Sequence, residues 1–399
     1  MKSNYEPLGK HIQLVDYRNS EEVTSTVLGI SIDKEFMPSV ANVIGTDLSR
    51  YKLISKGLFA CNPMHVGRDE RLPIALYEKD SPAIVSPAYF MFEIIDRDVL
   101  NEEYLMMWFR RPEFDRECWF MTDGSVRGGI TWDDLCRIQL PVPPYERQLD
   151  VVESYRAITR RIAMKKEIND NLAKTIKAVF KSWFLDFDAF DGVELVQSQY
   201  GLIPNGWHYE LLGNLCDCVT KGTTPTTLGK DFTDTGINFI KGESINDDHS
   251  FNKTLFAHID DETDELLKRS RIYVNDIVFT IAGTLGKFAL VDSSVIPANT
   301  NQAVAIIRTS KIMPAMLYSY FIGEWQGEFY KRNTQQAVQA NLSLGTIKDL
   351  PILLPDSKGQ DHYMQLVTPL IVGMQNNFSE IERLYELQNQ LLARLSSSR

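Results

Sequence analysis

The sequence predicts an α+β protein in which one head-and-helix design occurs twice. Tyr5–Gly9 and Tyr209–Gly213 share four of five residues, at an offset of 204. At the other end of each copy, residues 130–144 align with 342–356 at an offset of 212, and a long apolar-periodic segment follows. A period near two hundred residues is far longer than that of stacked repeats. We therefore expect a duplicated domain.

The two long segments, residues 146–181 and 361–395, are predicted to be helices. Their apolar residues recur mostly at spacings of three and four, so each helix can bury one stripe against the other. A helix of about forty residues is roughly 60 Å long. The first segment carries nine basic and five acidic residues, net +4, and the second two and four, net −2. We interpret the charged residues as solvent-exposed faces of the helices, and we expect the two helices together to act as a spacer.

The heads are predicted to mix short strands with helices, because β-rich runs alternate with Gly, Pro and Asn clusters. In the second head, strands are expected at 277–281, 288–291 and 303–307, and a helix at 315–331. In the first head, strands are expected at 83–95, a helix at 102–111, and a strand at 135–142 leading into the long helix. Each head is thus a small α+β unit.

Composition indicates a globular protein of a reducing compartment. The chain has 399 residues, 44% of them apolar, and its cysteines form no Cys-x-x-Cys pair. Five is an odd number, so neither a disulfide framework nor a zinc site is expected: Cys61, Cys118, Cys136, Cys216 and Cys218. Charged residues interrupt the N-terminus, and no apolar run approaches bilayer length. We expect a cytoplasmic protein with no membrane partner.

The net charge of −11 argues against a protein that coats nucleic acid indiscriminately, since lysine and arginine supply most non-specific affinity for phosphates. Local basic surfaces remain compatible with this charge. The expected function must therefore come from particular loops and motifs.

Several of these motifs resemble the specificity subunit of type I restriction-modification systems. Phe180–Asp188, followed by Gly201–Trp207, is similar to the central hinge of that family. In the second head, Lys221–Pro225, Gly236–Gly242 and Ala298–Ala303 occur in the order of the family's target-recognition domain. The resemblance covers essentially the whole chain.

The first head is a looser match. It lacks the Gly-Thr-Thr-Pro element, and only Gly124–Arg127 with Ile130 and Thr131 is similar to the late loop of the family. Divergence is what the resemblance implies, because each head of such a subunit reads a different half of an asymmetric DNA site.

The resemblance implies two α/β-type target-recognition domains in a pseudo-two-fold arrangement, separated by two long antiparallel coiled-coil helices. Its expected divisions are a first recognition domain at 1–145, a spacer helix with hinge at 146–188, a second recognition domain at 189–356 and a C-terminal spacer helix at 357–399. The implied function is non-catalytic binding of a bipartite double-stranded DNA target. Modification subunits, two of them, would bring S-adenosylmethionine, and restriction subunits would bring ATP-driven translocation with Mg²⁺; this chain would bind no cofactor or metal.

The residues themselves offer no clear chemistry. Val142–Tyr145 has valine where a DNA-adenine methyltransferase needs Asn or Asp before Pro-Pro, and is interpreted as a strand-to-helix turn. Gly283–Phe288 is too short for a phosphate-binding loop and is interpreted as a hairpin turn. Pro355–Lys358 resembles a nuclease fragment but is interpreted as a helix start. Two alternatives stay open: a self-contained DNA methyltransferase or nuclease, and a coiled-coil scaffold that does not bind DNA.

Base reading requires paired donors and acceptors on loops, with hydroxyls and lysines for phosphates. In the first head, the candidate DNA-binding residues are His65, Arg68, Arg71, Ser125 and Arg127. In the second head they are Lys221, Thr223, Thr224, Lys287, Asn299, Asn301, Gln302, Gln335, Gln339 and Asn341. Aromatic residues of the hinge and the second helix are candidates for partner docking: Trp183, Phe184, Phe187, Phe378 and Tyr385.

Overall fold

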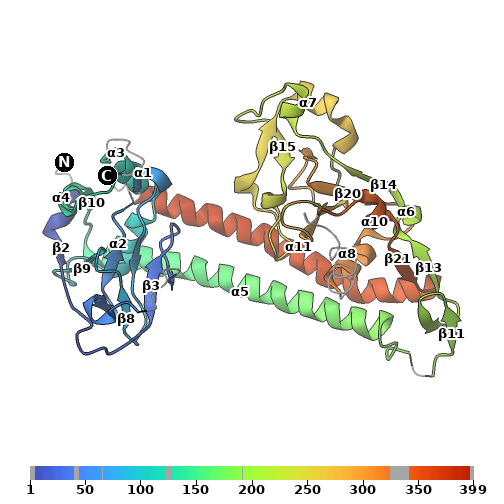
Figure 1. Ribbon diagram of the computed structural model, residues 1–399, viewed down its shortest axis with the longest axis horizontal. Helices are drawn as coiled ribbons and strands as arrows, with labels where there is room; N and C mark the ends of the chain where they lie inside the picture. Colours follow the sequence, from blue (N-terminus) through green and yellow to red (C-terminus); the bar gives the residue numbers. More distant parts are fainter. Residues whose placement is uncertain are drawn as a thin grey trace. The chain divides into compact units, whose positions relative to one another are not determined.

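Two units make up the chain, and each contains one head and part of both long helices (Figure 1). Unit 1 comprises Met1–Ile162 and Glu382–Arg399, and unit 2 comprises Ala163–Ile381. The computed structural model describes residues 5–39, 45–64, 66–122, 128–190, 192–323 and 341–395. The predicted α+β class is confirmed in both units.

The first head contains two four-stranded sheets. One has the order β2 (Ile12–Leu14), β9 (Phe90–Ile94), β6 (Phe59–Cys61) and β7 (Ile74–Leu76). The other has the order β4 (Phe36–Pro38), β3 (Val27–Ile30), β8 (Ala83–Val85) and β5 (Lys52–Ile54), with β3 and β8 parallel. The helices are α1 (Val66–Asp69), α2 (Glu102–Phe109), α3 (Pro112–Phe120) and α4 (Trp132–Arg137).

The second head repeats this topology except that its second sheet has three strands among the described residues, with an isolated bridge between Ile272 and Ala298 in the place of β5. Its first sheet has the order β14 (Cys216–Lys221), β20 (Val304–Thr309), β17 (Ile277–Thr280) and β18 (Phe288–Leu290). Its second has the order β16 (Ala257–Ile259), β15 (Ile237–Ile240) and β19 (Ala298–Thr300), with β15 and β19 parallel. A separate hairpin of β11 (Leu195–Ser198) and β12 (Gly201–Pro204) precedes the head. The helices are α6 (Leu212–Leu215), α7 (Asp261–Leu266), α8 (Pro314–Ile322) and α10 (Leu344–Lys348).

A two-stranded ribbon closes each head, and the two ribbons have the same register. In β1 (Tyr5–Pro7) with β10 (Gln139–Pro141), Tyr5 lies opposite Pro141. In β13 (His208–Leu211) with β21 (Pro351–Leu354), Tyr209 lies opposite Leu353. These pairs reproduce the sequence offsets of 204 and 212. The predicted duplication is therefore confirmed at the level of strand pairing.

The glycine that ends each opening motif has a packing reason. A Cβ added at Gly9 would lie 2.7 Å from Cys136 Cβ, and one added at Gly213 would lie 3.0 Å from Lys348 Cβ. Cys136 and Lys348 occupy equivalent places in α4 and α10. Only glycine lets the start of each head approach these helices so closely.

The strand predicted at 135–142 is partly wrong. Leu135–Arg137 belong to α4, which begins with a capping box at Thr131 and Asp134, and only β10 is extended. The strand prediction overlooked this helix, although the Thr-x-x-Asp spacing of Thr131 and Asp134 is a helix-start signal. The helix predicted at 315–331 is seen as α8 as far as Ile322; residues 324–331 lie outside the described ranges.

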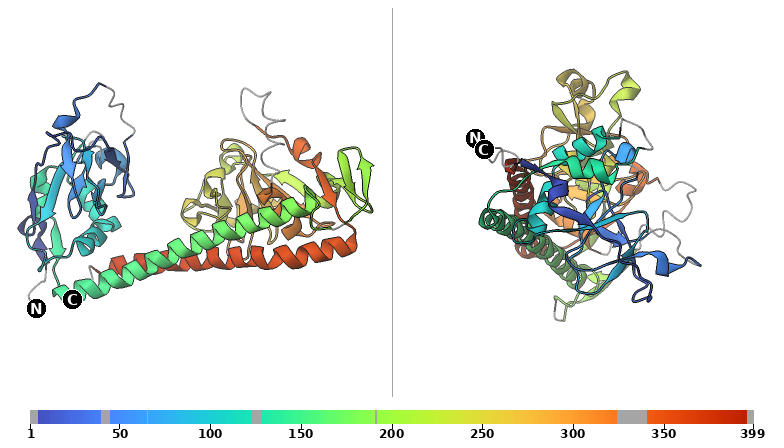
Figure 2. Two further views of the ribbon diagram at one scale, coloured as in Figure 1. Left: turned by 90° about the horizontal axis from the view of Figure 1, so that it is seen from below. Right: turned by 90° about the vertical axis from the view of Figure 1, so that its left-hand side faces the viewer.

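The long helices match the predicted segments. The first, α5, spans Tyr145–Phe184, and the second, α11, spans Ser357–Arg394. The turn at Val142–Pro144 leads into α5, and Asp356 begins α11 by accepting a hydrogen bond from Gly359 N at 2.8 Å. Figure 2 shows the two helices side by side within unit 2.

Amides and charges, rather than an unbroken apolar stripe, fill part of the helix contact in unit 2. Ile168, which the periodicity placed in the stripe, is 42% exposed, whereas its neighbour Asn169 is 4% exposed. Asn377 Nδ2 donates to Asn169 Oδ1 at 2.7 Å, and Lys165 Nζ donates to Asn377 Oδ1 at 2.9 Å. A buried asparagine in a coiled coil selects one alignment of the helices. We call Asn169 and Asn377 the amide pair.

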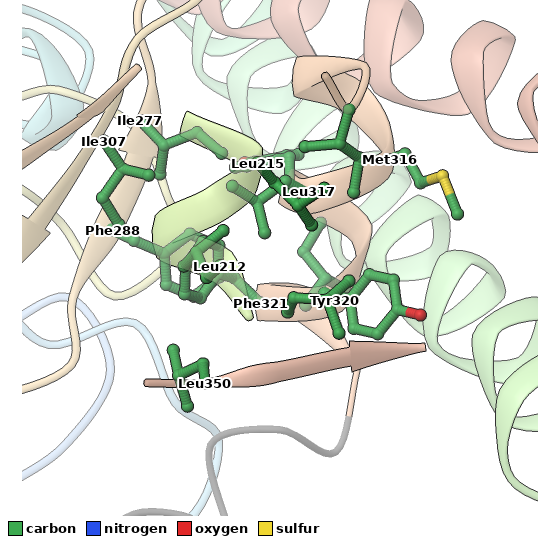
Figure 3. Packing of buried hydrophobic residues seen from close by; sticks show 14 of the residues in the cluster. Leu212, Leu215, Ile277, Phe288, Ile307, Met316, Leu317, Tyr320, Phe321 and Leu350 are labelled. Atoms are coloured by element: carbon green, nitrogen blue, oxygen red, sulfur yellow. The ribbon is translucent and has the colours of Figure 1, made fainter. Parts of the chain in front are cut away.

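The apolar core of unit 2 joins the head to the ends of both long helices in that unit. It includes Leu212, Ile277, Phe288 and Phe321, which Figure 3 shows packed together. Trp183 and Phe184 belong to the same core and are only 3% and 5% exposed. Their assignment to partner docking is therefore corrected.

The three other docking candidates remain at least partly accessible. Phe187 is half-buried and packs edge-on against Trp207, at a ring centroid distance of 6.0 Å. Phe378 is half-buried at the edge of the unit 2 core, and Tyr385, in unit 1, is exposed. Their role in docking stays a prediction.

Candidate nucleic-acid interface

Loops from five places in the second head meet at one edge of its sheets. Strands β14, β15, β17 and β19 end there, and β20 begins there. Backbone hydrogen bonds link the loops: Ile281 N to Ala303 O at 2.8 Å, and Leu342 N to Ile281 O at 2.9 Å. We call this surface the loop edge; it comprises Lys221–Thr224, Lys241–Gly242, Ile281–Lys287, Asn301–Ala303 and Asn341.

The loop edge unites most of the candidates predicted for the second head. Those present are Lys221, Thr223, Thr224, Lys287, Asn301, Gln302 and Asn341. Gln335 and Gln339 lie outside the described residues. Four stretches that are far apart in sequence thus supply donors and acceptors to one surface.

Gly222 holds the first of these loops against the third. A Cβ at Gly222 would lie 1.6 Å from the Thr300 carbonyl oxygen, and Gly222 N donates to Asn301 O at 3.1 Å. Thr300 is itself fixed, because its hydroxyl donates to Ile240 O at 2.7 Å. The two loops are therefore in backbone contact that leaves no room for a side chain at position 222.

The side chains above this backbone contact are also joined. Thr224 Oγ1 donates to Gln302 Oε1 at 2.6 Å; Thr224 is half-buried and Gln302 is exposed. Asn301 Oδ1 accepts from Ala303 N at 3.0 Å, which shapes the turn that carries Gln302. The Oε1 end of the Gln302 amide is thus held by Thr224, while Gln302 remains exposed.

Two charged groups at or beside the loop edge were missed by the sequence analysis. Asp247, which is exposed, pairs with Lys287 Nζ at 3.1 Å. Lys241 Nζ lies 4.8 Å from the centre of the Phe232 ring. Lys241 belongs to the motif Gly236–Gly242. Its place directly after the strand β15 is a signal that could have identified it as a candidate.

Asn299 does not belong to this surface, and its assignment to DNA binding is corrected. Its side chain is fully buried in β19 and accepts from Ser270 Oγ at 2.7 Å. It also donates to Asp264 Oδ1 at 3.1 Å. An amide with buried partners on both ends supports the fold of the head, whereas Asn301 is half-buried and Gln302 is exposed.

His249 fastens the loop that carries Asp247. Its ring stacks on Phe288 at a centroid distance of 4.0 Å, and its backbone has a left-handed φ of 69°. Burial lowers the pKa of His249, although the neighbouring Asp248 acts in the opposite direction. The neutral ring therefore suits this site.

The first head brings its candidate loops to the equivalent edge. Ile130 N donates to Pro63 O at 3.1 Å, which matches the bond from Leu342 to Ile281, and Gly67 N donates to Gly128 O at 3.1 Å. Arg68 and Arg71 are exposed there but are paired with Asp69 at 2.7 Å and Asp33 at 3.2 Å. The other candidates, His65, Ser125 and Arg127, lie outside the described residues.

A buried ion pair fixes this part of the first head. Lys34 Nζ donates to Asp115 Oδ1 at 2.6 Å and to Leu72 O at 3.2 Å, and Leu72 N donates to the same carboxylate oxygen at 3.1 Å. Burial lowers the pKa of Lys34, and Asp115 opposes that change. The pair links the turn after β3, the loop before β7 and α3, which together frame the arginines.

Neither a metal-binding cluster nor a membrane-spanning helix is found in the part of the chain that the structure describes. No group of three or more His, Cys, Asp or Glu side chains there could hold a metal ion. No helix among these residues combines the length and apolarity that crossing a bilayer requires.

The geometry defines a class of protein with duplicated heads, each of which gathers loops at one sheet edge. Comparison with known proteins shows which family this chain is similar to. Residues 204–382 match the family model described as the type I restriction modification DNA specificity domain. The chain is 23% identical to the type I restriction enzyme MjaIX specificity subunit of Methanocaldococcus jannaschii, over 76% of this chain and 70% of that one.

Two further proteins extend the comparison. The HindI specificity subunit of Haemophilus influenzae is 23% identical over 67% of this chain and 70% of its own length. The S subunit of the type I restriction-modification system from M. genitalium has the same fold, with a TM-score of 0.54 at 13% identity over 99% of this chain and 96% of that one. The chain is thus similar to the specificity subunits of type I restriction-modification systems, which confirms the resemblance that its hinge and loop motifs predict.

Proposed function

We propose that this chain selects the DNA sequence on which a type I restriction-modification complex acts, each head reading one half of a bipartite asymmetric site. The observation that carries the proposal is the loop edge, where candidate base-reading residues from separate stretches form one surface. Duplicated heads with unlike loops suit a target with two unlike halves. The divisions at residues 1–145, 146–188, 189–356 and 357–399 are the functional parts that we propose.

The chemistry of the loop edge fits base reading. Glutamine and asparagine amides can donate and accept at once, which is the pattern that adenine displays in the major groove. Gln302, Asn301 and Asn341 offer such groups, while Thr223 and Lys221 offer contacts to phosphates. Each mismatched base pair typically costs about 1 to 3 kcal/mol, so two heads multiply their discrimination.

The charges fit local rather than general DNA binding. Lys287 is held by the exposed carboxylate of Asp247, and a surface pair of this kind contributes only about 0 to 1 kcal/mol. A DNA phosphate can take the place of Asp247 at little cost. The overall charge of −11 meanwhile disfavours binding away from the loop edges.

We further propose that the chain contributes no catalytic group and binds no cofactor. Modification subunits, two per complex, would hold S-adenosylmethionine, and restriction subunits would use ATP and Mg²⁺, in the cytoplasm. Phe187, Phe378 and Tyr385 are the remaining candidates for docking these partners. A scaffold role without DNA is less well supported, because it gives no reason for polar loops to converge in each head.

The experiment is a selection from random duplex DNA by the full chain co-expressed with its modification subunits. We expect a motif of two defined halves separated by an unspecified spacer. The full chain alone is then incubated with the selected duplex and S-adenosylmethionine.

The outcomes separate the alternatives. Methylation by the chain alone would support a self-contained methyltransferase, and cleavage by the chain alone a nuclease. Recovery of the complex with no enriched motif would favour a scaffold. A bipartite motif that is methylated only with the modification subunits would support the proposal.

A further inference from the structure

The contact between Thr224 and Gln302 joins two loops that are separated by 78 residues in sequence. Gln302 is exposed, so rotation about its side-chain bonds would normally spread its amide over several orientations. The Thr224 hydroxyl removes part of that freedom because it holds Oε1 at 2.6 Å. The amide is thereby oriented before any ligand arrives.

We propose that Gln302 reads an adenine in the half-site of the second head, and that Thr224 is the positioning residue that orients its amide. This inference rests on the proposed function and assigns separate roles to two residues of the loop edge. Gln302 Nε2 donates to adenine N7, and the free lone pair of Oε1 accepts from adenine N6. Thr224 contacts the glutamine and not the base.

The backbone beneath makes the orientation reproducible. Gly222 places its loop directly on the Thr300 carbonyl, and the bond from Gly222 N to Asn301 O fixes the separation of the two loops. Thr224 itself begins a short 3₁₀ turn, and its carbonyl accepts from Thr227 N at 3.0 Å and from Thr227 Oγ1 at 2.7 Å. Both partners of the hydroxyl-to-amide bond are thus carried on fixed backbone.

An oriented amide distinguishes adenine from the other bases better than a rotating one. If the amide turned over, Nε2 would face adenine N6, donor against donor, and the paired contact would be lost. A carboxylate at the same place would offer acceptors only, which suits the N4 amino group of cytosine. The identity of the side chain at position 302 should therefore set the base that is preferred.

The experiment measures base preference at each half-site position, with the full chain in complex with its modification subunits and a randomised duplex library. We expect Gln302→Ala to lower the preference for adenine at one position of one half-site by roughly 5-fold to 150-fold. Gln302→Glu should shift the preference at that position toward cytosine. The other half-site should keep its bases.

The role of Thr224 is tested by removing and restoring its hydroxyl. Thr224→Val keeps the shape of the side chain and should lower the adenine preference at the same position by about threefold to tenfold. Thr224→Ser should restore it. Thr226→Val, the same substitution two residues further along this turn, is the matched control and should leave that position unchanged.

The results separate three conclusions. If the unchanged chain enriches no bipartite motif, the proposed function fails. If it enriches a motif but Gln302→Ala and Gln302→Glu leave every preference unaltered, Gln302 is not a reader and the inference is overturned. If only the Gln302 variants act and Thr224→Val binds like the unchanged chain, the positioning role of Thr224 is overturned.

Discussion

The two heads differ less in their frame than in how each fixes its loops. Both are closed by a ribbon of the same register, and Leu8 N and Leu212 N donate to Ile138 O and Leu350 O at the same 2.8 Å. The first head, however, secures its loops with buried Lys34 and Asp115, whereas the second uses the backbone contact at Gly222.

The loop after β2 in the first head and the loop after β14 in the second head illustrate this contrast. In the first head, Asp16 pairs with Arg18 at 2.7 Å, and Arg18 Nη1 donates to Arg50 O at 2.7 Å. In the second head, the corresponding loop contains Gly222 and rests on backbone. The loop anchors therefore differ between the heads while the frame is the same, which suits the proposal that each head reads its own half of the target.

Removal of the buried carboxylate should produce the largest effect and confine it to the first head. Asp115→Ala leaves the Lys34 ammonium buried without its partner, which typically costs about 3 to 5 kcal/mol. Hydrogen exchange of the full chain should show this loss in unit 1 only. Asp33→Ala, which removes an exposed partner of Arg71, should stay within about 0.5 kcal/mol. Equal effects of the two variants would contradict this account of the first head.

A side chain at Gly222 should have the next largest effect, in the second head. Gly222→Ala places a Cβ on the Thr300 carbonyl, and the loops must separate at a cost of about 1 to 3 kcal/mol. Selection from random duplex should then return the first half-site intact and the second one degraded. Gly345→Ala, in α10, has its nearest neighbour at 3.4 Å and serves as control. Loss of both halves with Gly222→Ala would argue against independent heads.

Acid should weaken the second head through His249. Burial lowers the pKa of this side chain below its ordinary 6.5, so between the two values the unfolded chain binds more protons than the folded one. Stability from this residue is therefore lost as the pH falls below about 6.5. Urea unfolding at pH 7.5 and 5.5 should show a smaller pH difference for His249→Asn than for the unchanged chain. His208→Asn, at an exposed position, should leave the pH difference as it is.

Lengthening the helices should leave both sets of bases unchanged. One heptad inserted between Ile162 and Ala163 in α5, and one between Ile381 and Glu382 in α11, preserves the seven-residue pattern and adds about 10 Å to each helix. We expect the selected motif to have a different spacer and the same half-sites. Altered half-site bases would contradict the prediction that the helices set only the spacer length while the heads read the bases.

The sequence predicted the frame well because the frame depends on local patterns. Repeated Tyr-Glu-x-Leu-Gly openings, helical periodicity and the start of α11 at Asp356 all have short-range causes that the structure bears out. The loops of the second head were singled out from a resemblance carried by Lys221–Pro225 and Ala298–Ala303, but their meeting at one edge was not predicted, because it depends on the pairing of strands far apart in the sequence.

The direction of individual side chains could not be predicted in the same way. Asn299 and Gln302 lie three residues apart in one polar run, yet one is buried against Ser270 and the other is exposed beside Thr224. Likewise, Ile168 fits the apolar spacing but Asn169 occupies the helix contact. Burial is decided by partners distant in the sequence, such as Asp264 and Asn377.

The amide pair also bears on how the chain is made. Its two members are 208 residues apart, so Asn169 leaves the ribosome long before Asn377 exists. A repeating apolar stripe would permit the late helix to settle one turn too early or too late with similar burial. Only one alignment of α11 on α5 lets the two amides meet. The bond between Asn377 and Asn169 therefore selects the correct alignment when α11, which is synthesised last, packs against α5.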